Sequence, residues 1–533
     1  MISQPVLLDS LQFADSAGCA RWVATLPLTN ISSAQRQLTG QIALAGQANL
    51  PATELLKILE TLREPVVQLQ REAAVKYAGK PLPLENSELV AWKTTVALWQ
   101  ELTRAYLACR DGWSGEPAGR RVHATLVTLR CLQYVGRTML EYYRIRHQPP
   151  SALWRQLNQL YAFAEQSGFA GAPTDAESGR REPVASCTAA FCRTLLIQLA
   201  NPFALTSRQL DFVDRWSEGW TPLVDLSKQP PSTPSTSPLT VDIAGDHGAM
   251  PAGEMKPASG LRHLDLDPLA RTLRQLITLL KQGQSPAQLG LGNEARQPGC
   301  ENLLMLLYIQ WCRSGTSRGE QRSTSEEKVQ VCLGMHAVHF HVGGSRAFRP
   351  PGSSLSRQEE QDLQLFGRIS ERTERLLASG DNVAVESWQL VNHSGAGFMC
   401  MLREQDARAR ISHNQLVAVR QNGHTSFHVG VVQWLRAEEN EELFIGVRLL
   451  ASHARAVAVR PVNFKLPGIH AFERALLLPA SSAPEMPATL ILPLGWHQAG
   501  RFVDIHGEQK QVAKLDGLLE KGSDFDRCIV LLS

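Results

Sequence analysis

Residues 392–402 read NHSGAGFMCML and lie inside a long region in which apolar side chains recur at about every second position. A period of two is typical of β-strands whose alternate side chains face a core. Regularly spaced short strands of this kind predict a barrel. The expected strands span residues 329–333, 337–342, 382–391, 398–402, 415–419, 427–435, 442–449 and 454–459.

This β-rich region has one interruption and one extension. Residues 346–380 are first polar and then helical in composition, and we interpret them as an insertion between barrel strands. A last β-rich run, residues 474–532, has the same period and is a candidate for a small second barrel. Its expected strands span residues 475–478, 488–492, 501–505 and 511–515.

The first half of the chain has the three-and-four spacing of amphipathic helices. Leu55, Leu59 and Leu62, for example, fall on one face of the first such helix. Short loops between amphipathic segments imply a helical bundle. The expected helices span residues 51–76, 87–110, 120–147, 151–166, 187–199 and 207–216, and two more follow at 266–281 and 301–313.

Residues 228–259 are rich in proline, serine and glycine, and we interpret them as a linker or a long loop. The sequence therefore predicts an α+β multidomain protein. The expected parts are an all-α helical domain in 1–225, a linker in 226–262, connecting helices in 263–316, a β-barrel in 317–465 with its insertion at 346–380, and a C-terminal β-rich domain in 466–533.

The composition argues against several classes of function. Lysine and arginine number 54 against 51 acidic residues, so a net charge of +3 creates no global field for nucleic acid or an acidic membrane. The ten cysteines form no CxxC pair, which indicates reduced thiols. The sequence shows neither a secretory signal nor a membrane span. We therefore expect a cytoplasmic protein with no nucleic-acid partner.

Two short motifs adjoin the expected strands, RGEQR at Arg318–Arg322 and NHSGAG at Asn392–Gly397. Their order resembles the paired signature of the PilZ family, RxxxR followed by [D/N]xSxxG. Residues 430–436, GVVQWLR, and 445–449, IGVRL, resemble later strands of the PilZ barrel. The resemblance covers about residues 318–460. It implies an antiparallel six-stranded β-barrel that binds the bacterial second messenger cyclic di-GMP.

The chemistry of the motif residues fits such a ligand. The two arginines present planar forks of donors that match phosphate oxygens and the O6/N7 edge of guanine. The asparagine offers an amide for a base edge, the serine a short hydroxyl, and the glycines permit positive φ and close approach. The residues expected to bind the ligand are Arg318, Arg322, Asn392, Ser394, Gly395 and Gly397.

The sequence departs from the family pattern in two respects. Arg322 and Asn392 lie 70 positions apart, so residues 346–380 must loop out of the barrel. Asn392 also stands where aspartate is common, and it replaces a charged acceptor of guanine N–H groups with a neutral one.

The resemblance implies a signalling effector and not an enzyme. The motifs GxxxxGK[ST] and HExxH do not occur, and no GxGxxG follows a strand. We expect no cofactor and no metal. Bound cyclic di-GMP would order the loop before the barrel and reorient the helical half against an unidentified protein partner. Homodimerisation stays open, and so does the choice among motility, surface polysaccharide, biofilm formation and virulence.

Two alternatives to a cyclic di-GMP receptor remain open from the sequence. The barrel could serve as a scaffold or adaptor that binds no ligand. Residues 334–342, GMHAVHFHV, also contain His336, His339 and His341, of which the last two would share one strand face and could serve a metal. We favour ordinary strand histidines.

Overall fold

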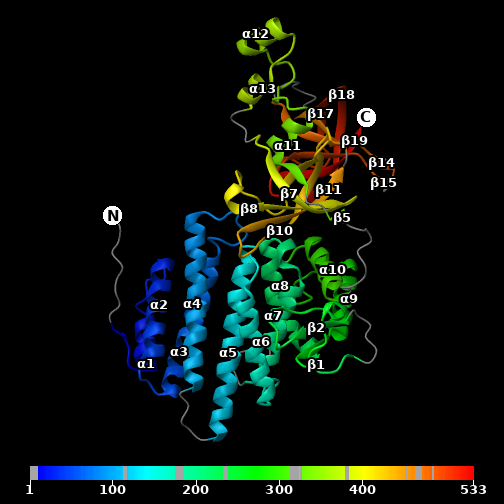
Figure 1. The fold of residues 1–533 in the computed structure, drawn as a ribbon. Helices are drawn as coiled ribbons and strands as arrows, with labels where there is room; N and C mark the ends of the chain where they lie inside the picture. The colour runs from blue at the N-terminus through cyan, green and yellow to red at the C-terminus, as the bar shows by residue number, and fades with distance from the viewer. Residues whose placement is uncertain are drawn as a thin grey trace. The chain divides into compact units, whose positions relative to one another are not determined.

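The computed structural model describes residues 10–111, 117–174, 185–231, 238–312, 323–324, 327–378, 383–451, 453–462, 471–482 and 485–532 (Figure 1). The chain divides into two compact units. Met1–Lys80 and Leu84–Ser317 form the first, here named the helical unit. Pro81–Pro83 and Arg318–Ser533 form the second, here named the β unit.

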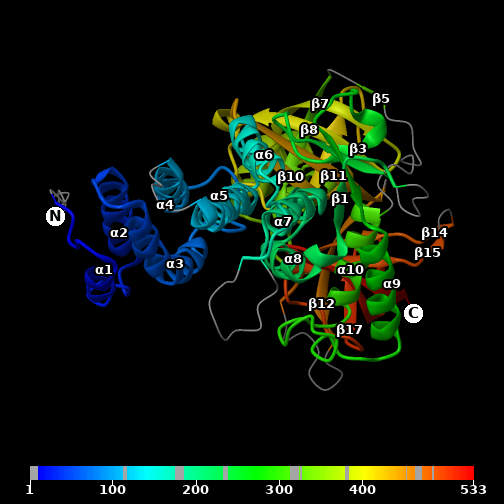
Figure 2. The same cartoon turned by 90° about the horizontal axis from the view of Figure 1, so that it is seen from below.

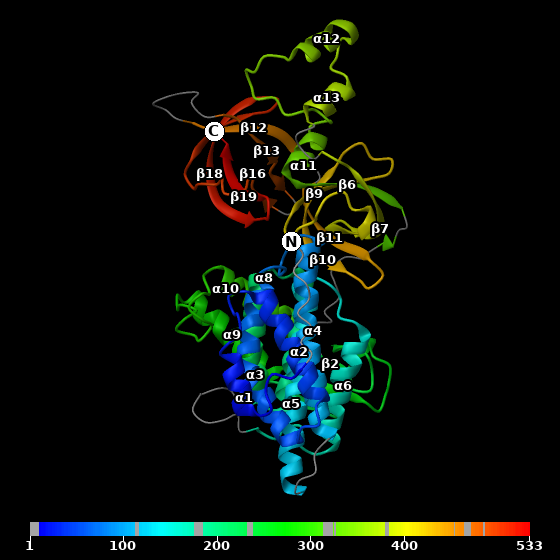
Figure 3. The same cartoon turned by 90° about the vertical axis from the view of Figure 1, so that its left-hand side faces the viewer.

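The helical unit consists mainly of amphipathic helices that bury their apolar faces against one another. On α3 (Ala52–Ala74), Leu55, Leu59 and Leu62 are buried, as their spacing predicts. Figures 1 and 3 show α2 to α6 as rods that run side by side, so the expected helical bundle is confirmed. Its other helices are α1 (Ser16–Val23), α2 (Ile31–Gln47), α4 (Asn86–Asp111), α5 (Pro117–Arg144), α6 (Ser151–Gln166), α7 (Cys187–Leu199), α8 (Ser207–Trp220), α9 (Asp267–Lys281) and α10 (Gly299–Cys312).

Helices α1 and α2 precede the first helix that the sequence pattern predicts. Helix α2 opens with Ile-Ser-Ser and contains Thr39 and Gly40, residues of weak helix propensity. Its stability comes from tertiary packing, because Leu38 and Ile42 are fully buried in the bundle core.

The interpretation of residues 226–262 as a linker is wrong. The described part of this stretch contributes to a four-stranded sheet with the strand order β1-β4-β2-β3. Leu239, Val241 and Leu264 are buried in the same core as the helices, so a few apolar residues suffice despite the polar composition. The strands are β1 (Asp225–Ser227), β2 (Leu239–Asp242), β3 (Met250–Pro251) and β4 (Leu261–Asp265).

A buried asparagine and an ion pair fasten this sheet to α6. Asn158 Nδ2 donates to the carbonyl oxygens of Asp242, Gly245 and His247 at 3.3, 3.0 and 3.2 Å. A few residues further along α6, Glu165 accepts two hydrogen bonds from Arg262 of β4. Because one amide satisfies three turn carbonyls, the 242–247 turn has a defined position against α6.

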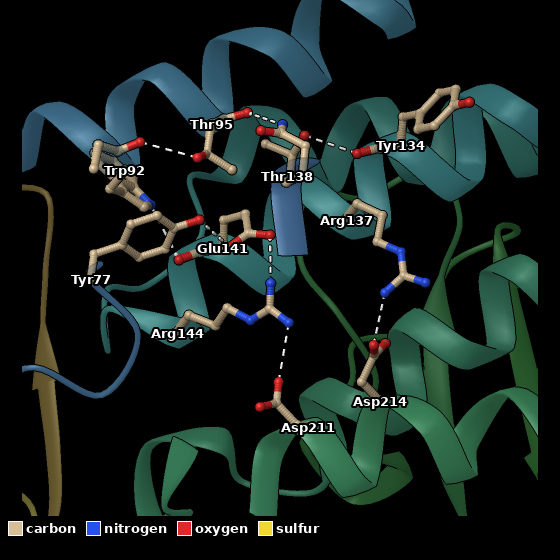
Figure 4. Close-up of polar contacts among 12 residues, drawn as sticks. Tyr77, Trp92, Thr95, Tyr134, Arg137, Thr138, Glu141, Arg144, Asp211 and Asp214 are labelled. Carbon is tan, nitrogen blue, oxygen red and sulfur yellow. Dashed lines mark hydrogen bonds and ion pairs between the residues drawn. The ribbon is translucent and has the colours of Figure 1, made fainter. Parts of the chain in front are cut away.

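Partly buried ion pairs join α5 and α7 to α8, and Figure 4 shows the contacts between α5 and α8. Arg137 Nη1 donates to Asp214 Oδ2 at 2.7 Å, and Arg193 Nη2 donates to Asp214 Oδ1 at 2.8 Å. Burial acts to raise the pKa of Asp214, but the guanidinium charges outweigh it and hold this pKa well below its usual range. On the next turns of α5, Arg144 pairs with Glu141 at 2.8 Å. The helix interface thus depends on charges that neutralise one another away from water.

Replacing Asp214 with asparagine will destabilise the helical unit by about 2 kcal/mol, because Arg137 loses its ion pair and Arg193 keeps only Glu218, at 3.3 Å. The urea midpoint of the far-ultraviolet circular dichroism signal measures this loss. Asp246, whose pair with Arg155 is about half exposed, supplies the control. Asp246→Asn should cost less than about 1 kcal/mol, and equal losses in the two variants would contradict the assignment.

The β unit begins with a ring of six antiparallel strands. The strand order is β7-β6-β9-β10-β11-β8, and β8 returns to pair with β7, so the ring is closed. The expected six-stranded antiparallel barrel is therefore confirmed. A short further strand, β5 (Ser323–Thr324), pairs with β7 outside this ring. The ring strands are β6 (Lys328–Leu333), β7 (Glu386–Ser394), β8 (Gly397–Arg403), β9 (Leu416–Gln421), β10 (His428–Ala437) and β11 (Glu442–Ala451).

Two expectations for this barrel are wrong. Residues 337–342, expected as a strand, belong to helix α11 (Gly334–Val342), since a short apolar run does not distinguish a buried strand from a buried helix. The strand expected at 454–459 is β12 (Arg455–Pro461), which pairs with β13 and β17 and so belongs to the following barrel.

The C-terminal β-rich region forms a second closed barrel with the strand order β12-β13-β16-β19-β18-β17. Val459, Leu490 and Leu515 are among its fully buried core residues. A two-stranded ribbon, β14 (Ser481–Ser482) and β15 (Glu485–Met486), leaves the barrel between β13 and β16. The other strands are β13 (Glu473–Leu478), β16 (Thr489–Pro493), β17 (Phe502–His506), β18 (Lys510–Lys521) and β19 (Phe525–Leu532).

Helix α11 and Asp524 connect the two barrels within the β unit. Val338 of α11 is buried in a cluster with Leu416 of the first barrel and Leu476 of the second. Asp524, in the β18–β19 turn, accepts from the backbone N–H groups of Leu416 at 2.9 Å and Met335 at 3.2 Å. Burial raises the pKa of Asp524 to about 6 and outweighs these hydrogen bonds.

The raised pKa makes the β unit less stable as Asp524 ionises. The stabilising effect of the neutral carboxyl is complete below its ordinary pKa of 3.8 and is lost as the pH rises through about 6. The Asp524→Asn side chain cannot ionise. The free energy of unfolding of this variant should therefore rise, relative to that of the wild type, by up to about 3 kcal/mol between pH 3.8 and pH 6. Urea midpoints measured across this pH range test the prediction. Asp516→Asn, which changes an exposed carboxylate, is the control and should follow the wild-type pH profile of stability. If the Asp524→Asn variant follows that profile as well, the prediction is wrong.

Candidate ligand-binding site

Of the two motifs identified in the sequence, the structure describes only the second, Asn392–Gly397. Arg318 and Arg322 lie outside the described residues. Strand β5 begins at Ser323, the residue after Arg322, and it pairs with the strand that carries the second motif. Ser323 lies opposite His393 and Thr324 opposite Asn392. The chain that leaves the arginine motif is therefore attached to the asparagine motif, although 70 positions separate Arg322 from Asn392.

The second motif forms a tight hairpin between β7 and β8. Ser394 pairs with Gly397, and only Gly395 and Ala396 connect them. Ser394 Oγ accepts a hydrogen bond from the Ala396 N–H at 3.2 Å, so its hydroxyl stabilises the turn as well as facing the surface. Gly395 and Ala396 are exposed, and a ligand can approach this backbone.

Gly397 is required by close packing and not by a positive φ. Its backbone lies opposite Arg448 of β11, and a Cβ atom at this position would lie 2.1 Å from the carbonyl oxygen of Val447. Only glycine fits this approach without moving a strand. The close approach at Gly397 is therefore to strand β11, the expected approach of a ligand stays a prediction, and the expected left-handed backbone is not found at this residue.

Asn392 is half-buried on β7, two residues before the turn. A register shift between Leu390 and Asn392 marks a bulge, which alters the direction of the strand just before the motif. The Asn392 Nδ2 atom lies 3.3 Å from Met399 Sδ on the paired strand. The amide is thus held beside the hairpin and not in the barrel core.

Aromatic side chains that the sequence analysis did not single out extend from the hairpin across the barrel. The ring centroids of His393 and Phe398 lie 6.5 Å apart, and those of Phe398 and His428 lie 6.1 Å apart. Burial lowers the pKa of His428, and nearby His424 lowers it further, which favours the neutral ring. The partly exposed rings of His393 and His428 offer faces on which a purine can stack, and buried Phe398 packs between them. Of these side chains, only His393 lies inside a motif that can be recognised in the sequence, NHSGAG.

The strands that follow the motif carry a matched pair of residues. Trp434 of β10 lies opposite Gly446 of β11. A Cβ atom on Gly446 would lie 2.0 Å from the indole Nε1 of Trp434, so the indole occupies the space that the glycine leaves. This packing is the physical reason for a tryptophan and a glycine on adjacent strands.

The histidines of residues 334–342 do not form a metal site. His339 Nε2 lies 3.2 Å from the carbonyl oxygen of Val457, and His341 Nε2 lies 2.9 Å from that of Val383. Burial lowers the pKa of His339 to about 4, which is typical of a packed histidine. Throughout the described ranges, no group of three or more histidine, cysteine or acidic residues has a geometry suited to a metal ion.

The described helices also differ from helices that span membranes. None of them is both long enough and apolar enough to cross a bilayer.

Three family models match successive parts of the chain. The N-terminal domain of the cyclic-di-GMP receptor FimW matches residues 17–232, its middle PilZ domain matches residues 250–374 and 353–456, and the FimW C-terminal β-barrel domain matches residues 457–529. A curated relative, the cyclic-di-GMP receptor FimW of Pseudomonas aeruginosa PAO1, is 23% identical over 555 residues. The alignment covers 94% of this chain and 88% of that relative. No solved structure matches the chain.

Replacing Gly397 with valine will disrupt the β7–β8 hairpin, because the new side chain meets the Val447 backbone and cannot rotate away. We expect a loss of about 3 kcal/mol or more in the stability of the first barrel. Urea unfolding followed by tryptophan fluorescence measures it. Gly517→Ala is the control, because a Cβ atom there meets no atom within 4 Å. A Gly397→Val protein as stable as this control would contradict the close-packing argument.

Proposed function

We propose that this chain, which belongs to the FimW family of PilZ-domain proteins, is a receptor for cyclic di-GMP whose site lies at the β7–β8 hairpin of the first barrel. One observation carries the proposal: strand β5 joins the end of the arginine motif to the asparagine motif. The name of the Pseudomonas relative supports the same ligand.

Each motif residue has a separate role in this proposal. Arg318 and Arg322 bind the phosphates and a guanine edge, where their fixed donor forks suit both groups. Asn392 pairs with a base edge, and Ser394 donates from the turn. Gly395 leaves the exposed turn backbone open to the ligand, and Gly397 lets β8 pack closely against β11 beside it.

The charge of the ligand matches the arginine motif. Cyclic di-GMP carries two phosphodiester groups, and two guanidinium groups neutralise them. Three to four charge-assisted hydrogen bonds of this kind provide both affinity and discrimination against uncharged nucleosides. No cofactor or metal enters this mechanism, and we propose no catalytic step.

The position of the arginines also suggests how a signal leaves the site. Helix α10 ends at Cys312 and β5 begins at Ser323, so the arginine motif belongs to the segment that joins the helical unit to the β unit. Binding of both arginines to one anionic ligand reduces the conformational freedom of that segment. We therefore propose that the ligand controls presentation of the helical unit to a protein partner.

A receptor of this kind would act in the bacterial cytoplasm, where the messenger is made. The ten cysteines are buried and unpaired, which supports a reducing compartment.

Arg318→Ala and Arg322→Ala will each weaken cyclic di-GMP binding about 30-fold or more, because each removes a charge-assisted contact worth roughly 2 kcal/mol or more. Isothermal titration with cyclic di-GMP, GTP and cyclic di-AMP measures affinity and guanine specificity. Arg357→Ala, which changes an exposed arginine of the insertion, is the matched control.

Unchanged affinity in both motif variants would overturn the proposed site. No binding by the wild-type protein would overturn the receptor function itself and leave the scaffold alternative.

A further inference from the structure

The insertion in the first barrel is built with its polar side chains inside. Helices α12 (Arg357–Phe366) and α13 (Glu371–Leu377) are described over their whole length. Their buried side chains are Glu359, Asp362, Thr373 and Glu374, and neither helix buries an apolar side chain. A helix that contributes to a core has the opposite pattern.

Ion pairs and caps hold the insertion together in place of an apolar core. Arg349 lies between the two helices, 2.5 Å from Glu359 Oε1 and 2.9 Å from Glu374 Oε1. The Ala347 N–H donates to Glu374 Oε2 at 2.7 Å, and the Ser370 N–H donates to Asp362 Oδ2 at 2.9 Å.

These contacts involve ionised carboxylates. Burial acts to raise the pKa of Glu359, but hydrogen bonds from Ser356 and Arg349 hold it at about 2. The pair of helices therefore has a defined shape that does not depend on its apolar side chains.

The apolar side chains of the insertion are on its outside. Leu365, Phe366 and Leu376 are 74%, 65% and 64% exposed, and Leu363 and Leu377 are also exposed. Figures 1 and 3 show α12 and α13 projecting from the barrels of the β unit. We name this surface the α12–α13 tip. Several large apolar side chains on one projecting element mark a site that another body covers.

Positive charge surrounds these apolar side chains. The exposed arginines of the two helices and their connection outnumber the exposed glutamates, Glu360 and Glu371. A second copy of the same tip would bring like charges together, so a negatively charged occupant fits better. The arginines are Arg357, Arg368, Arg372 and Arg375.

The placement of the apolar side chains favours a fluid occupant over a protein groove. A helix that binds in a protein groove inserts apolar side chains spaced three and four residues apart on one face. Leu363 and Phe366 have this spacing, but Leu365 projects from nearly the opposite side of α12 to Leu363, and Leu376 and Leu377 are adjacent on the short α13, so the apolar set spreads beyond one helix face. Lipid can surround side chains that diverge in this way, whereas a rigid groove cannot.

We propose that the α12–α13 tip is a peripheral membrane-docking element that inserts its leucine and phenylalanine side chains into an anionic lipid surface. Leu365 and Phe366 enter the headgroup region, and the arginines contact the lipid phosphates. A local patch of this kind needs no large net charge on the whole chain. The inference does not depend on cyclic di-GMP binding.

Cosedimentation of the full-length protein with large vesicles tests this proposal. We expect the wild type to bind vesicles of equal parts phosphatidylglycerol and phosphatidylcholine, to bind pure phosphatidylcholine much more weakly, and to dissociate at high salt. Leu365→Ser with Phe366→Ser should lower the partition coefficient at least about tenfold, because two apolar side chains no longer enter the lipid. Arg368→Ala with Arg372→Ala should lower it at low salt.

The matched control changes two leucines exposed elsewhere. Leu518 and Leu519 of β18 are 45% and 46% exposed, and serine at both positions should leave vesicle binding unchanged. Circular dichroism shows whether each variant is folded. Absence of wild-type binding to anionic vesicles overturns the proposal and makes a protein the occupant of the tip. Equal losses in the tip and control variants also overturn it.

Discussion

The pairing of β5 with β7 is the contact on which the proposed site depends. Its register sets Ser323 opposite His393 and Thr324 opposite Asn392, so the residue after Arg322 is held two or three positions from the β7–β8 turn. Backbone hydrogen bonds in a ladder of two residues are few, and the ladder is at an edge. Such a contact is well suited to respond to a ligand, because a small gain in binding free energy is comparable to the free energy of the pairing itself.

The rest of the β unit provides a rigid support for that edge. The ring of six strands closes through β7 and β8. The close approach of Gly397 to Val447 packs the β7–β8 hairpin tightly against β11. On the other side of the barrel, α11 and Asp524 join the first barrel to the second through shared apolar packing and two backbone hydrogen bonds. Within the β unit, the ladder between β5 and β7 is therefore a much smaller contact than those that close the ring.

The helical unit and the insertion use buried charge in different ways. In the bundle, Asp214 neutralises two partly buried arginines, and these contacts specify how α5 and α7 meet α8. In the insertion, Arg349 joins buried carboxylates of the two helices, whose leucines stay outside, and apolar burial is limited to a small cluster with Ala347 and Ala378. The first arrangement joins helices inside the helical unit, and the second leaves apolar side chains exposed on α12 and α13.

The sequence by itself determined the helices of the bundle from α3 onward, most barrel strands and the chemistry of both motifs, because periodicity and residue type are local properties of the chain. Tertiary structure decided the rest. It turned residues 337–342 into a helix, gave β12 to the second barrel and folded residues 239–242 into a sheet, since strand partners and burial depend on contacts between residues far apart in the chain. The inverted burial of α12 and α13 was decided in the same way, because Arg349 supplies from outside both helices the charge that draws their carboxylates inward.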